Sequence, residues 1–80
     1  MMIRAYLVEA LKRARYTRLD DGSYCGEVRD LRGVVGTGRT LESCRDALQD
    51  VVEEWILVRV ARRLQVPALG GKKIRIRMAG

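Results

Sequence analysis

Apolar residues recur at intervals of three and four positions in two segments, which is the spacing of one face of an α-helix. In residues 3–14 this stripe consists of Ile3, Tyr6, Leu7, Ala10, Leu11 and Ala14. In residues 40–64 it consists of Leu41, Cys44, Leu48, Val51, Trp55 and Val58, widened by Ala47, Val52, Ile56 and Val60. Thr40 is a good N-cap, Glu42 suits the first turn, and Pro67 limits the C-terminal end. The pattern predicts a short leading helix and a long second helix.

The remaining segments have the pattern of β-strands and turns. Residues 15–28 predict a hairpin around Asp20-Asp21-Gly22-Ser23, because Asp bonds its own backbone and Gly accepts a positive φ. A bend at residues 30–33 and a strand at 33–37 complete a meander over 15–37. Residues 72–78 alternate between apolar and basic side chains, as in a half-buried edge strand. The order α-β-β-β-α-β predicts one α+β domain over residues 1–80, in which the long helix packs on an antiparallel three-stranded meander plus the final strand.

Length and composition indicate a small domain with a marginal core. A chain of 80 residues buries about 60–65% of its unfolded surface. We therefore expect further burial in a homodimer or homotetramer. An apolar content of 48% supports a globular fold, and the apolar runs are too short for a membrane-spanning helix. Two cysteines without a signal peptide predict free thiols and a cytoplasmic protein.

The net charge of +6 is unevenly distributed along the chain. Residues 1–19 carry +4, residues 20–54 carry −5, and residues 55–80 carry +7. An acidic middle suits a basic partner, whereas basic ends suit nucleic acid. Simple solvation of a small domain explains the same pattern equally well.

No set of residues has the composition of a catalytic site. The chain lacks histidine, the most common general base. Asp20, Asp21 and Glu27 offer carboxylates to a metal, but an Asp-Gly pair is the ordinary chemistry of a hairpin turn. Cys25 and Cys44 have no second cysteine pair, which favours buried thiols over metal ligands. We expect no enzyme activity, no metal and no cofactor.

The glycines between the third strand and the long helix have a structural interpretation. Gly33, Gly36 and Gly38 are not followed by the lysine and serine or threonine of a phosphate-binding loop. The favoured interpretation is strand-end geometry, and Gly36 and Gly38 predict a close approach of backbone to backbone at the end of the strand. Trp55 is in phase with Leu48 and is expected in the core.

Together these segments resemble the HicB-like antitoxin family. The matching positions are Asp21, Gly22 and Tyr24, then Leu31 and Gly33, then Gly38 and Thr40, then Leu41, Glu42, Leu48 and Trp55 of the helix. The resemblance covers residues 15–78 and implies a partial ribonuclease-H-like fold, with the leading helix typical of small single-domain relatives. Arg29 and Arg32 stand where the family usually has prolines, so this bend should be less rigid and more basic. The chain ends without the DNA-binding domain of longer antitoxins, so we expect no autoregulation by that route.

The resemblance implies a binding protein that occludes a HicA-type toxin, a small ribonuclease that cleaves messenger RNA. Since an RNA-binding toxin should be basic, the acidic segment is the expected contact. The candidate contact residues are Asp21, Glu27, Asp30, Glu42, Asp46 and Asp50. The alternative is a small basic module that binds nucleic acid without catalysis, through Arg59, Arg62, Arg63, Lys73, Arg75 and Arg77. Nucleic-acid binding by an antitoxin of this kind should be weak, and no membrane partner is expected.

Overall fold

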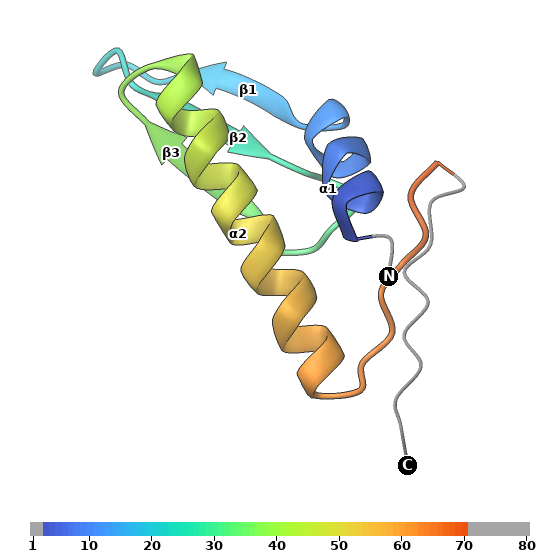
Figure 1. The fold of residues 1–80 in the computed structure, drawn as a ribbon. Helices are drawn as coiled ribbons and strands as arrows, with labels where there is room; N and C mark the ends of the chain where they lie inside the picture. The colour runs from blue at the N-terminus through green and yellow to red at the C-terminus, as the bar shows by residue number, and fades with distance from the viewer. Residues whose placement is uncertain (1–2, 71–80) are drawn as a thin grey trace.

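A long helix lies across one face of a three-stranded antiparallel sheet, and a short helix packs beside it (Figure 1). The computed structural model describes residues 3–70. Its elements are α1 (Ile3–Lys12), β1 (Arg15–Arg18), β2 (Tyr24–Glu27), β3 (Val35–Gly38) and α2 (Leu41–Ala61). The predicted α+β class and the order of these five elements are confirmed. The strand predicted over residues 72–78 lies outside the described residues.

The sheet is a meander with β2 in the centre. Tyr16 of β1 pairs with Gly26 of β2, which pairs in turn with Gly36 of β3. In the turn between β1 and β2, Gly22 has a φ of 87° and its N–H donates a hydrogen bond to the Leu19 carbonyl at 2.9 Å. The predicted Asp-Gly turn is therefore confirmed, and glycine provides the positive φ that it requires.

The backbone of α2 lies directly against β3 at Gly36 and Gly38. A Cβ atom at Gly36 would lie 2.7 Å from the backbone nitrogen of Leu48 and 2.8 Å from its Cα atom. Gly38 meets the backbone of Ser43 and Cys44 in the same way. The Cys44 thiol also donates a hydrogen bond to the Gly36 carbonyl at 3.4 Å. The predicted close approach at Gly36 and Gly38 is confirmed, and any side chain at these positions would push the helix away from the sheet.

The hydrophobic core fills the space between the sheet and the two helices. Its buried residues are Tyr6, Leu7, Ala10 and Leu11 of α1, Val28, Leu31 and Val34 between β2 and β3, Leu48, Val52 and Ile56 of α2, and Leu69. The Tyr6 hydroxyl donates a hydrogen bond to the Pro67 carbonyl at 2.5 Å, and burial raises the pKa of this phenol. The apolar stripe of α1 is thus covered within the monomer, so it is not itself a reason for oligomerisation.

Thr40 caps the N-terminus of α2, as predicted. Its side-chain oxygen accepts a hydrogen bond from the Ser43 backbone N–H at 3.0 Å. The Ser43 hydroxyl oxygen accepts one from the Thr40 backbone N–H, also at 3.0 Å. This reciprocal capping box satisfies backbone donors that the helix leaves free, and Glu42 adds a favourable negative charge in the first turn.

The prediction that the second helix continues to residue 64 is wrong, because α2 ends at Ala61. Arg63 has a φ of 57°, in the left-handed region. Its N–H bonds to the Val60 carbonyl at 3.0 Å, and the Leu64 N–H bonds to the Arg59 carbonyl at 2.8 Å. These two bonds form a Schellman motif, which usually has glycine at the left-handed position. An arginine there gave no sequence signal for the end of the helix.

Two apolar residues expected on the buried face of α2 are exposed instead. Leu41 and Val58 lie at the surface, whereas the buried residues of the helix are Cys44, Leu48, Val52 and Ile56. These four follow each other at a constant interval of four, which rotates the row by about 40° at each step. The buried row therefore moves around the helix away from Val58, whereas Cys44 and Leu48 of the predicted row stay buried.

The Gly36→Ala variant should lower the free energy of unfolding by about 1–3 kcal/mol, because the added methyl group must displace the backbone of α2. Urea unfolding measures this loss. Thr37→Ala is the matched control, since Thr37 is exposed and should lose less than about 0.5 kcal/mol. Equal losses in both variants would contradict the close contact.

The Arg63→Gly variant should raise the free energy of unfolding by about 1 kcal/mol, because glycine adopts the left-handed conformation without the Cβ penalty. Arg62→Gly is the control: Arg62 has a φ of −91°, so this change relieves nothing and should destabilise the protein. If both glycine variants were destabilised alike, the left-handed end of α2 would be rejected.

Candidate partner-binding surface

Carboxylates form a row along the solvent-facing side of α2. Glu42, Asp46 and Asp50 are exposed and follow each other at intervals of four, so they lie on one side of the helix. Glu54 continues the row at the same interval and is also exposed. We call these four residues the acidic row; it is about 18 Å long. Within residues 3–70, none of the four forms an ion pair.

Three of the four residues of the acidic row were predicted from the sequence as contact residues, and Glu54 was missed. The interval of four from Asp50 was the signal that would have identified it. An unpaired row of like charges repels itself, so it is stabilised by a partner of opposite charge. This is the property expected of a surface that receives a basic protein.

The other three predicted contact residues have local roles. Asp21 accepts hydrogen bonds from the Ser23 side chain at 2.5 Å and the Ser23 backbone N–H at 2.9 Å, and these bonds lower the pKa of its carboxyl group. Glu27 pairs with Arg29 at 3.3 Å. Asp30 is engaged by a distant residue of the chain, Arg13, whose guanidinium lies 3.1 Å away. The structure therefore does not bring these three carboxylates into the acidic row.

A shallow hollow of about 280 Å³ lies between the β1–β2 turn and the start of α2. Asp21, Gly22, Ser23 and Arg39 line it. Asp21 is thus near the N-terminal end of α2, although its carboxylate is occupied by the turn.

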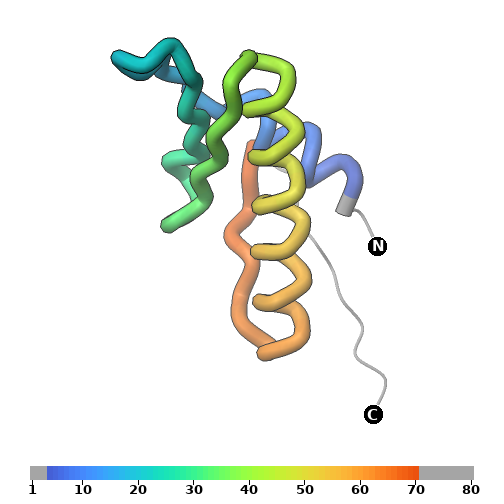
Figure 2. The backbone as a smooth tube through the Cα atoms, turned by 90° about the vertical axis from the view of Figure 1, so that its left-hand side faces the viewer, coloured from blue at the N-terminus to red at the C-terminus, as the bar shows by residue number. Residues whose placement is uncertain are grey.

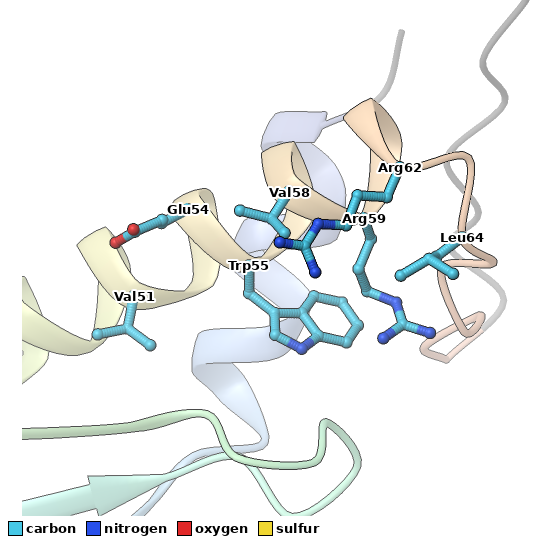
Figure 3. Close-up of a pocket in the computed structure, with 7 residues that line it drawn as sticks. All are labelled: Val51, Glu54, Trp55, Val58, Arg59, Arg62 and Leu64. Atoms are coloured by element: carbon cyan, nitrogen blue, oxygen red, sulfur yellow. The ribbon is translucent and has the colours of Figure 1, made fainter.

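The C-terminal half of α2 carries a groove of about 340 Å³ with an apolar floor and a charged rim (Figure 3). Its lining residues are Val51, Glu54, Trp55, Val58, Arg59, Arg62 and Leu64. Trp55 packs partly against the core, as predicted, but its indole ring also lines this groove. The Arg59 guanidinium lies 4.8 Å from the centre of the indole, and its Nε donates to the Gln65 carbonyl at 2.7 Å. These contacts hold the groove wall in a defined position.

The arginines proposed for nucleic-acid binding are only partly available. Arg59 is engaged by Trp55 and Gln65, whereas Arg62 and Arg63 are exposed at the C-terminal end of α2, where cations complement the helix dipole. The other candidates, Lys73, Arg75 and Arg77, lie outside the described residues. The described part of the chain thus presents a small basic cluster at one helix end.

Cys25 and Cys44 are free thiols. Burial is the main cause that raises the pKa of the Cys44 thiol, and the nearby Cys25 raises it further. In this part of the chain, no three His, Cys, Asp or Glu side chains converge as metal ligands would. Neither described helix has the length and apolar character needed to cross a membrane.

Comparison with known proteins identifies the family. The UPF0150-like family model matches residues 5–67, so the chain belongs to this family, which is related to the HicB-like antitoxins. The chain is also similar to a solved structure, that of TTHA0281 from Thermus thermophilus, with 39% sequence identity and a TM-score of 0.88 over 95% of each chain. No curated protein matches the chain. Because the family match begins at residue 5, α1 belongs to the shared domain and is not an addition to it.

Proposed function

We propose that this protein is an antitoxin that binds and occludes a HicA-type, RNA-cleaving toxin through the acidic row of α2. The family supplies the toxin–antitoxin context. The observation that carries the proposal is the acidic row itself: Glu42, Asp46, Asp50 and Glu54 are exposed, aligned and free of ion pairs within residues 3–70.

Electrostatics explains why such a surface suits this partner. An enzyme that binds RNA must present Lys and Arg side chains to the phosphates of the RNA backbone. A rigid helix with carboxylates about 6 Å apart presents negative charge to the same basic surface. Attraction of this kind raises the association rate and selects against acidic partners. Binding would then cover the substrate site of the toxin without any chemistry by the antitoxin.

Reversing two charges of the acidic row should weaken toxin capture. We expect the double variant Glu42→Lys with Asp46→Lys to bind the candidate toxin at least about tenfold more weakly, mainly through slower association. The toxin to test is the product of a short, basic neighbouring reading frame, and surface plasmon resonance at two salt concentrations measures both rates.

Two controls define this experiment. Arg75→Ala with Arg77→Ala should have a smaller effect on toxin binding. Arg45 is exposed on α2, so Arg45→Glu adds a carboxylate to the helix surface and should not weaken toxin capture. The alternative function, a nucleic-acid-binding module, is favoured by the exposed Arg62 and Arg63, of which Arg62 lines the groove with Trp55. Tight, sequence-selective binding to duplex DNA that falls steeply with salt and is lost in the Arg75→Ala, Arg77→Ala variant would replace the antitoxin proposal with this one.

We also propose that the protein acts by binding alone. Purified protein incubated with RNA or DNA and magnesium or manganese should give no cleavage above a blank, because the sequence offers no histidine and the described carboxylates do not converge. Gel analysis of labelled substrate provides the measurement. Reproducible cleavage that disappears in Asp21→Asn would establish a catalytic role.

A further inference from the structure

The C-terminal half of α2 extends beyond the sheet (Figures 1 and 2). One side of this half is covered by α1 and by the chain that turns back after residue 63. The other side is bare among residues 3–70 and exposes large apolar side chains: Leu57 is 59% exposed, Val58 41% and Leu64 47%. Val58 and Leu64 also line the groove beside Trp55, so these two side chains and the groove form one apolar surface.

The charges at the edges of this surface are arranged symmetrically about Val58. Glu54 lies four residues before Val58 and Arg62 lies four residues after it, so the three form one row along the helix. All three line the groove. If a second copy of α2 packs antiparallel with its two-fold axis at Val58, Glu54 of one copy faces Arg62 of the other, and the reverse pair forms at the other end. Such a surface is complementary to itself, which is the requirement for a two-fold interface.

We propose that two copies of this chain form an antiparallel α2–α2 homodimer centred on Val58, with reciprocal Glu54–Arg62 pairs between the copies. The apolar side chains around Val58 and Trp55 then form the buried centre, and the charged pairs form the rim. Residues 54, 58 and 62 form an i±4 ridge, and packing such ridges against each other gives the commonest helix crossing, near about −50°. A domain of 80 residues gains buried area that its own core lacks.

The chemistry of the surface favours a second copy over other occupants. A basic toxin would meet Arg62, which repels it, and nucleic acid would meet Glu54 and an apolar floor. Glu54 belongs both to this surface and to the acidic row, so dimerisation leaves the toxin only the other carboxylates of the row. In the antiparallel arrangement Glu42 lies about 24 Å from the axis in each copy, at opposite ends. The first half of the acidic row thus stays accessible, so a toxin would bind twice per dimer.

A charge-swap experiment tests the pairing directly. Glu54→Arg places two arginines opposite each other at each end of the interface, and Arg62→Glu places two glutamates there. Each single variant should raise the dimer dissociation constant at least about tenfold, and the double variant should return it to within about threefold of wild type, because the pairs are restored in reversed order. Sedimentation equilibrium distinguishes the 9.1 kDa chain from its dimer. Circular dichroism confirms that each variant is folded.

A second measurement locates the axis. In a Cys25→Ser background, Val58→Cys should give a disulfide-linked dimer under mild oxidation, since a residue on the axis meets its own copy at bonding distance. Asp46→Cys is the control and should stay unlinked. The chain has one tryptophan, Trp55, so its emission should shift to the blue as concentration rises through the dimer transition.

Three results would overturn the proposal: a wild-type monomer at high micromolar concentration, a double variant no tighter than the singles, or cross-linking through Asp46→Cys without Val58→Cys. In the first case, altered toxin capture by Arg62→Glu, at a groove residue outside the acidic row, would assign the surface to the toxin instead.

Discussion

Gly36 allows the backbone of α2 to lie directly against β3, and the position of the helix follows from this contact. A Cβ atom there would fall 2.7 Å from the Leu48 nitrogen, so helix and strand are separated by no side chain at this point. Interiors pack densely and tolerate little change of volume, so this contact fixes both the height and the angle of α2 over the sheet. The capping box of Thr40 and Ser43 begins the helix immediately after β3, so the connection between β3 and α2 is short.

Fixing α2 at its N-terminal half gives its two halves different environments. The first half packs on the sheet and presents the acidic row on its opposite side. The second half passes beyond the sheet and keeps apolar side chains in solvent. One helix thus offers a charged surface and an apolar surface that suit different partners, and the rigid helix holds them at a constant distance.

The sequence was sufficient for the elements whose signals are local. Helical spacing predicted both helices, the Asp-Gly pair predicted the hairpin turn, and Thr40 predicted the start of α2. The end of α2 was missed because Arg63 adopts a conformation that usually belongs to glycine. The exposure of Val58 was missed because periodicity gives the face of a helix but not the length of the sheet that covers it.

The candidate surface was predictable only in part, because some of its features depend on tertiary packing. Exposed charge on a helix follows from spacing, whereas the pair of Arg13 with Asp30, 17 residues away, depends on tertiary packing. The groove at Trp55 likewise depends on how the chain turns back after the helix ends, and no local pattern encodes either feature.

The hydrogen bond from Tyr6 to the Pro67 carbonyl has a consequence for synthesis on the ribosome. Its two residues are 61 positions apart, so the contact forms only after the segment that follows α2 has emerged. Until then the core that covers Tyr6, Leu7 and Leu11 of α1 is incomplete. Contacts of such long separation slow folding, and apolar surface exposed in the meantime favours aggregation. The nascent chain is therefore vulnerable throughout the synthesis of the sheet and of α2, and it becomes protected when the segment around Pro67 closes the core over the first helix.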